Sequence, residues 1–119
     1  MTDFVERIFE WNKARDNTDF SIELETDMLN EECIELTQAL TDAQELDAVA
    51  DIVFVSIGTL YKVSKKYNIN PLELMKIVCD ANDKKGSKKN SEGKILKAAD
   101  FKKPDAHGGA IDKLLESVK

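Results

Sequence analysis

The segment from Glu45 to Tyr67 runs without the residue clusters that usually mark a turn. Its middle part, Ile52–Ile57, is rich in β-branched residues and would also suit a buried strand. A typical strand has only about 5–6 residues, so the length of the segment favours a helix. We therefore predict a long, buried central helix, in which Gly58 marks the close approach of another helix.

Apolar residues recur at helical spacing in most of the remaining chain. Asn70 followed by Pro71 is typical of a helix start, because asparagine caps the first turn and proline fits its first position. We expect an all-α, four-helix-bundle-like fold with an irregular lysine-rich C-terminal segment and a short terminal helix, in a single domain over residues 1–119. The expected helices span residues 2–15, 21–40 (capped by Asp19 or Ser21), 45–67 (capped by Thr41 or Asp42), 70–84 and 110–118, with residues 86–104 irregular.

Composition narrows the class of protein. Hydrophobic residues make up 42% and charged residues 34% of the chain, which is typical of a globular protein. No stretch approaches the roughly 18 consecutive apolar residues of a membrane span, and the N-terminus lacks a secretory signal, so we expect a cytoplasmic protein without a membrane partner. Cys33 and Cys79 have no CxxC spacing and are expected to be reduced thiols.

Charge is unevenly divided along the chain. Residues 1–55 carry 15 acids and 3 bases, a net charge of −12, whereas residues 62–103 carry 12 bases and 5 acids, a net charge of +7. Two such regions can pair with each other or serve a ligand such as a metal-bound polyphosphate, although solvated helix faces account for the same counts. The overall charge of −6 and the scarcity of aromatic residues among the lysines argue against a nucleic-acid partner.

Five acids form two clusters within the expected helices. In a helix with about 100° per residue, the acids of each cluster share one face. Asp51 directly precedes the apolar run, so its carboxylate must pair, shift its pKa or hold a cation. Carboxylates from two antiparallel helices would repel one another unless a hard cation such as Mg²⁺ lay between them. The clusters, Glu31, Glu32 and Glu35, then Asp47 and Asp51, therefore predict a magnesium site.

The same acids would also suit an amphipathic helix that faces solvent, where they would pair with lysines. A di-iron carboxylate site is disfavoured, because such sites take a Glu-x-x-His pair from each of two helices. The single histidine, His107, lies in a glycine-flanked tail. Magnesium therefore fits the clusters better than iron does.

At these residues the chain resembles the all-α nucleoside triphosphate pyrophosphohydrolases, the MazG-like superfamily. The EExxE motif of that family is matched by Glu31, Glu32 and Glu35. In its ExxD motif the aspartate is matched by Asp51, but Ala48 stands at the glutamate position, and Asp47 one residue earlier resembles a replacement. Further along, Asn82-Asp83-Lys84-Lys85 resembles an Asn-x-x-Lys element, and Gly93-Lys94-Ile95-Leu96-Lys97 with Phe101 and Pro104 is similar to a GKxxK…F…P tail.

The resemblance implies a MazG-type fold and hydrolysis of a nucleoside triphosphate between its α and β phosphates, giving a monophosphate and pyrophosphate. It implies that the catalytic residues are Glu31, Glu32, Glu35 and Asp51, and that Glu32, Glu35, Asp47 and Asp51 bind Mg²⁺. Phosphate or sugar contacts are implied for Asn82, Lys85, Lys94 and Lys97, and stacking on the base for Trp11. Family members are dimers or tetramers, so a homodimer or homotetramer is expected.

Two roles stay open on the sequence alone. Trp11 lies among Phe4, Ile8 and Phe9, and this setting favours core packing over stacking on a base. The shifted spacing of Asp47 and Asp51 also suits a non-catalytic helical interaction or regulatory module of the same fold.

Overall fold

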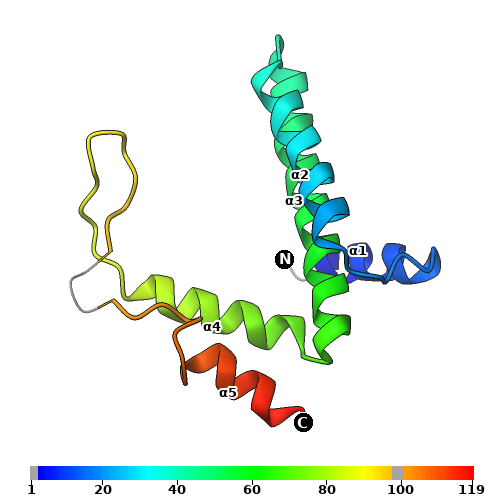
Figure 1. The fold of residues 1–119 in the computed structure, drawn as a ribbon. Coiled ribbons are helices and arrows are strands. Elements are labelled where there is room, and N and C mark those ends of the chain that lie inside the picture. Colours follow the sequence, from blue (N-terminus) through cyan, green and yellow to red (C-terminus); the bar gives the residue numbers. More distant parts are fainter. Residues whose placement is uncertain (1–2, 98–100) are drawn as a thin grey trace. The chain divides into compact units, whose positions relative to one another are not determined.

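The computed structural model describes residues 3–97 and 101–119, and in that part of the chain every regular element is a helix. The expected all-α class is therefore confirmed, and the β-branched run from Ile52 lies in the long third helix. The helices are α1 (Asp3–Ala14), α2 (Ile22–Thr37), α3 (Asp42–Tyr67), α4 (Pro71–Asp83) and α5 (Ala110–Ser117), as shown in Figure 1.

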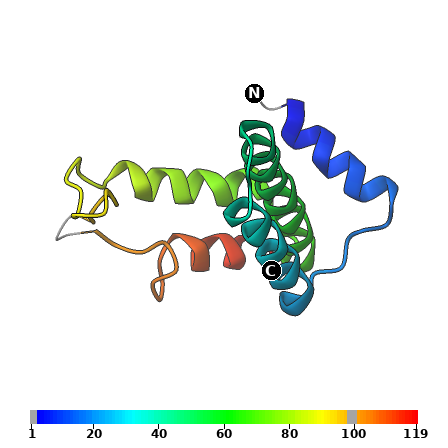
Figure 2. The same ribbon diagram turned by 90° about the horizontal axis from the view of Figure 1, so that it is seen from above.

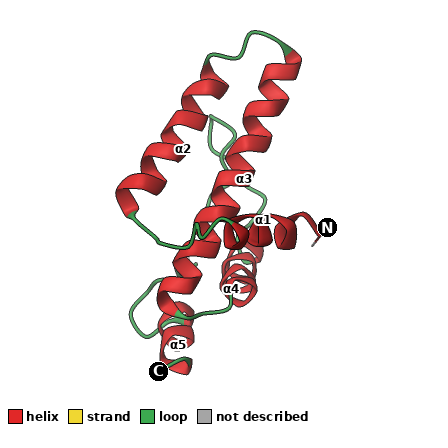
Figure 3. Ribbon diagram, turned by 90° about the vertical axis from the view of Figure 1, so that its right-hand side faces the viewer, coloured by secondary structure: helices red, strands yellow, loops and turns green. Residues whose placement is uncertain are grey.

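The chain divides into two compact units, Met1–Tyr67 and Asn68–Lys119. In the first unit, α2 and α3 pack side by side as an antiparallel hairpin, and α1 packs across α3 (Figures 2 and 3). In the second unit, α4 packs against α5. The expectation of one domain over residues 1–119 stays a prediction, as does the bundle arrangement. None of the described helices is long and apolar enough to cross a membrane.

Side-chain caps define where three of the helices begin. Thr41 Oγ1 accepts a hydrogen bond from the backbone N–H of Gln44 at 3.1 Å, which satisfies one of the free donors at the start of α3. Asn70 Oδ1 accepts from the N–H of Leu72 at 2.8 Å, and Pro71 occupies the first position of α4. Ser21 caps α2. Each of these caps was among those predicted from the sequence.

Gly58 lies where α1 crosses α3, as the sequence predicted. A Cβ atom at this position would come within 3.3 Å of Asn12 Nδ2, so α1 approaches α3 too closely for a larger residue to fit without movement. Asn12 is only 2% exposed; it donates to the carbonyl of Ile8 at 2.9 Å and accepts from Asn17 Nδ2 at 2.7 Å. These bonds satisfy a polar side chain that would otherwise be buried at a cost.

Aromatic side chains also join α1 to α3. The rings of Phe9 and Tyr61 lie with their centroids 5.4 Å apart, and Trp11 meets Phe54 edge to face at 5.1 Å. Both distances are within the range of favourable aromatic pairs. The guanidinium of Arg15 stacks over the Trp11 ring, 4.3 Å from its centroid.

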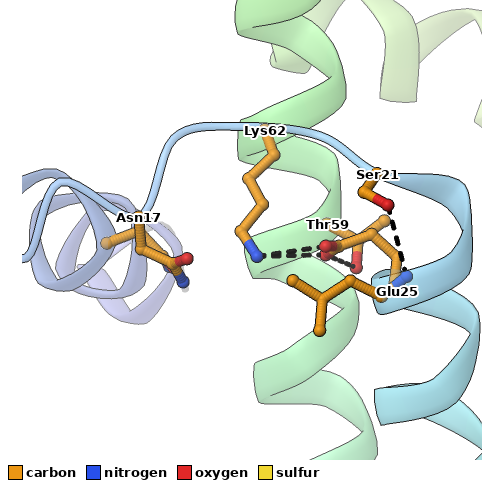
Figure 4. A network of polar contacts seen from close by, with 7 residues as sticks. Asn17, Ser21, Glu25, Thr59 and Lys62 are labelled. Carbon is orange, nitrogen blue, oxygen red and sulfur yellow. Dashed lines mark hydrogen bonds and ion pairs between the residues drawn. The ribbon is translucent and has the colours of Figure 1, made fainter.

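A buried ion pair joins α2 to α3. Lys62 Nζ lies 3.3 and 3.1 Å from the two carboxylate oxygens of Glu25, and Thr59 Oγ1 donates to Glu25 Oε1 at 2.8 Å (Figure 4). The side chains of Lys62 and Glu25 are only 2% and 4% exposed. Each charge is thus compensated by the other, since an unpaired buried charge would be strongly destabilising.

The apolar core within the described chain is small. Ile8, Ala48 and Leu114 are its only buried hydrophobic residues, while a row of larger residues on α3 is exposed. Leu46, Val49 and Val53 are 72%, 46% and 43% exposed, and their spacing places them on one face of the helix. This row leaves apolar surface uncovered.

The lysine-rich segment is irregular, as predicted, apart from residues 98–100, which lie outside the described part. Residues 88–96 form a tight turn around a single bridge between Lys89 and Ile95. Asn90 holds the turn, because its Oδ1 accepts from the N–H groups of Glu92 and Lys94 at 2.9 and 3.0 Å.

Replacing Lys62 tests how much the buried pair contributes to the free energy of unfolding. Lys62→Met should lower the free energy of unfolding by about 3–5 kcal/mol, because it leaves Glu25 buried without its counter-charge. The double variant Glu25→Leu/Lys62→Met should recover most of this loss, since it removes both charges together. Urea denaturation followed by circular dichroism measures both changes.

Lys76→Met is the matched control, because it makes the same exchange in a pair with Asp80 whose side chains are 75% and 55% exposed. It should change the free energy of unfolding by less than about 1 kcal/mol. An equally small effect of Lys62→Met would show that the pair does not stabilise the α2–α3 contact.

Candidate metal centre

Three carboxylates from two helices meet in the α2–α3 hairpin. Glu32 and Glu35 lie three residues apart on α2, so their side chains share a face, and Asp51 approaches from α3. One carboxylate oxygen of each residue lies within 4.8 Å of the others. We call these three residues the carboxylate trio. All three were predicted from the sequence as metal ligands.

The trio is electrostatically strained without a cation. Burial raises the pKa of Glu32, and the negative charges of Glu35 and Asp51 raise it further. The pKa of Asp51 is also raised, first by burial and then by the charges of Asp47 and Glu35. In addition, Glu32 Oε2 is buried and has no hydrogen-bond partner among the described residues. A bound cation would relieve each of these costs.

Asp47 lies at the edge of the trio. It stands one helical turn before Asp51, and a hydrogen bond between the two carboxyl groups contributes to the raised pKa of Asp51. Asp47 and Glu35 also line an open hollow of about 250 Å³ together with Gln38 and Gln44. This hollow extends from the trio toward the loop that joins α2 and α3. Asp47 is not one of the three converging acids, and its role as a metal ligand stays a prediction.

Glu31 and Ala48 lie near the trio in the sequence but are not part of it. Glu31 is exposed on α2 and is not one of the three converging acids, although its charge contributes to the raised pKa of Glu32. Ala48 is buried, 4% exposed, against the hairpin.

Trp11 lines a separate cavity of about 130 Å³ in the first unit, together with Asn12, Glu25 and Lys62. Its ring packs edge to face against Phe54 and also lines the cavity, while its stacking on a base stays a prediction.

The remaining predicted contacts lie in the second unit. Asn82 Nδ2 donates to the carbonyl of Val78 at 2.9 Å, within its own helix. The ammonium groups of Lys85 and Lys97 lie 5.4 and 5.6 Å from the centre of the Phe101 ring. Lys94 is exposed in the turn held by Asn90. Two of the lysines predicted to bind phosphate thus lie over the same aromatic ring, that of Phe101.

Sequence reasoning missed the buried polar residues beside the trio. Glu25 stands seven residues before Glu32, two helical turns away, so it shares the same face of α2. That spacing was available in the sequence. Its pairing with Lys62 was not, because the two residues are 37 positions apart.

The donor set of the trio consists of hard carboxylate oxygens, which suits Mg²⁺ or another hard divalent cation rather than a soft metal. No protein-family model matches this sequence, and no curated protein matches it significantly. The assignment of the site therefore rests on its own chemistry.

The raised pKa values predict a specific pH dependence for the metal-free protein. A raised pKa in the folded state means that protonation favours folding, so this contribution is present below the ordinary values of about 4.5 for Glu32 and 3.8 for Asp51, and it is lost as pH rises through the folded-state pKa. Asp51→Asn removes one charge permanently. The variant should therefore unfold at a higher temperature than the wild type at pH 7, with a difference that shrinks toward pH 4.

Mg²⁺ provides the complementary measurement. At pH 7 it should raise the unfolding temperature of the wild type by stabilising the charged trio, and it should have little effect on Asp51→Asn. Scanning calorimetry with and without the metal measures both. If the unfolding temperatures of the wild type and of Asp51→Asn change in the same way with pH and with Mg²⁺, the trio holds no cation.

Proposed function

We propose that this protein is a Mg²⁺-dependent nucleoside triphosphate pyrophosphohydrolase that releases pyrophosphate and a nucleoside monophosphate, and that it acts in the cytoplasm. The observation that carries the proposal is the convergence of Glu32, Glu35 and Asp51, which the EExxE and ExxD resemblance picks out independently. The unpartnered oxygen of Glu32 supports it, because such an atom needs either a proton or a cation.

Each acid of the site has a distinct task in this proposal. Glu32, Glu35 and Asp51 would hold Mg²⁺, with Asp47 as a further ligand. When bound, the cation would neutralise charge on the phosphates and supply Lewis-acid chemistry at the phosphoanhydride. Glu31 is exposed beside the trio and would accept a hydrogen bond from the attacking water, which orients it toward the α phosphate.

The same resemblance assigns substrate contacts to residues of the lysine-rich region. Lys85, Lys94 and Lys97 would contact phosphate oxygens as mobile point charges, and Asn82 would bond to phosphate or sugar. Two of these lysines would exchange their contact with Phe101 for a contact with the triphosphate. Trp11 would lie against the base, because it already lines a cavity in the unit that holds the trio.

The proposal predicts a metal-dependent activity that is lost on removing one charge. Wild-type protein should release pyrophosphate from nucleoside triphosphates only with Mg²⁺. Asp51→Asn should reduce kcat/KM by about a hundredfold or more, because it weakens the cation site at nearly constant shape. A coupled assay with inorganic pyrophosphatase, run over a panel of standard and modified nucleotides, measures this loss.

Asp27→Asn is the matched control, since it makes the same exchange at an exposed position of α2 outside the trio. Its kcat/KM should stay within about twofold of the wild-type value. Wild-type turnover by folded Asp51→Asn would rule out the proposed role of the trio.

One observation favours a second candidate, a non-catalytic helical interaction or regulatory module. Ala48, buried at 4% exposure, stands where the ExxD motif has a glutamate, so the site lacks one expected ligand unless Asp47 replaces it. Such a module would bind Mg²⁺ but release no pyrophosphate from any nucleotide of the panel. The same assay therefore separates the two candidates.

We further propose that the protein forms a homodimer or homotetramer through the exposed row of Leu46, Val49 and Val53 on α3. Three buried hydrophobic residues over the described positions are few for a chain of this size, and small domains commonly complete their cores by association. The row is continuous along one helix face, which suits packing against a symmetry-related copy.

A charge within this row should dissociate the oligomer. Val49→Asp would place an unpaired charge in the interface, so the mass measured by light scattering should fall to that of the 13.4 kDa monomer. Thr37→Asp, at an exposed position at the end of α2, should keep the wild-type mass. A wild-type protein that is monomeric at high concentration would refute the assembly.

A further inference from the structure

A second cavity lies next to the carboxylate trio on the same pair of helices. Met28 and Val55 line this cavity of about 130 Å³. Met28 precedes Glu32 by four residues on α2, and Val55 follows Asp51 by four residues on α3. Because a helix rises 1.5 Å per residue, the cavity and the trio are separated by about 6 Å along the hairpin. The cavity and the trio thus lie on the same two helices, about one turn apart along them.

The cavity has a built polar wall. Lys62 and Glu25 are 2% and 3% exposed, and Figure 4 shows the lysine side chain reaching toward Glu25 while Asn17 lies on the opposite side. Lys62 Nζ makes two hydrogen bonds among the described residues, both to Glu25. An ammonium group has three N–H donors, so one donor is left for a ligand in the cavity.

The amide groups on the other side of the cavity are held in one orientation. Asn12 Nδ2 donates to the carbonyl of Ile8, and Asn12 Oδ1 accepts from Asn17 Nδ2 at 2.7 Å. The hydrogen bond to the buried Asn12 side chain therefore fixes the orientation of the Asn17 amide. The side-chain oxygen of Asn17 takes part in neither of these bonds. Its carbonyl can accept a hydrogen bond from an N–H group of a ligand.

We propose that Lys62 is a specificity-determining residue, which selects a nucleobase with a ring carbonyl, such as hypoxanthine, guanine, uracil or thymine, over adenine. The proposal rests on the proposed function for the triphosphate. Lys62 donates its remaining N–H to the base carbonyl, at a point of the cavity where the lysine itself is only 2% exposed. Adenine would present its amino group to the ammonium, donor against donor, and would leave the buried N–H unpaired.

Inosine and adenosine test this selection directly, because they differ by a carbonyl or an amino group at one ring position. Trp11 is the single tryptophan and lines the cavity, so its fluorescence reports binding without metal, phosphate or turnover. Inosine should bind wild-type protein at least about tenfold more tightly than adenosine, as expected for one hydrogen bond from a charged donor. Equal affinities, or no binding of either nucleoside, would overturn the proposal.

Two variants assign the preference to Lys62. Glu25→Leu/Lys62→Met removes the donor without leaving an unpaired charge and should bind the two nucleosides equally. Lys76→Met makes the same lysine exchange on the exposed face of α4 and should keep the wild-type preference. If the double variant retains the preference, Lys62 does not determine it; if the double variant fails to fold, the wild-type titration decides.

Turnover separates this inference from the proposed function. Under both proposals, kcat/KM for ITP should exceed that for ATP by a similar factor of about ten. Pyrophosphate release at equal rates from ITP and ATP, with equal nucleoside binding, would remove the base selection and leave the hydrolase. Preferential binding of inosine with no pyrophosphate release would remove the hydrolase and support the base selection.

Discussion

The cost of placing charged side chains between two packed helices governs the α2–α3 hairpin. At one end of the contact the cost is met within the protein, because Glu25 is paired with Lys62 and bonded to Thr59. Two helical turns further along α2, Glu32 meets Asp51 with no basic side chain in the trio. The contact between α2 and α3 therefore holds one ion pair with balanced charges and one cluster of acids. A cation would be stabilised most at the cluster of acids.

The position of α1 follows from a second constraint, the lack of a side chain at Gly58. The close approach allows Asn12 to be buried against α3 and brings Trp11 onto Phe54. A cavity remains at the crossing, and the two residues of the buried ion pair, Glu25 and Lys62, line it. The crossing of α1 thus places the Trp11 ring against Phe54, which follows Asp51 by three residues on α3.

The proposed chemistry divides between the two units. The acids and the cavity belong to the first unit, whereas the lysines that would contact phosphate belong to the second. The acidic and the basic groups are thereby kept apart along the chain. The apolar row on α3 is exposed because α1 and α2, the helices that pack against α3 in the first unit, contact other faces of it.

Local signals in the sequence determined much of this architecture. The caps at Thr41 and Asn70 and the close approach at Gly58 follow from short-range preferences, and the structure agrees with each. The expected bounds were wrong by three residues at the break between α2 and α3, because α2 ends at Thr37 rather than residue 40 and α3 begins at Asp42 rather than residue 45. The shared face of Glu32 and Glu35 follows from helical periodicity alone. Only the tertiary structure decided which acids from α3 join them, that Glu31 lies outside the trio, and that Lys62 is buried against Glu25. These outcomes depend on the register and rotation of two packed helices, which are set by contacts between residues far apart in the chain and are not encoded in any local pattern.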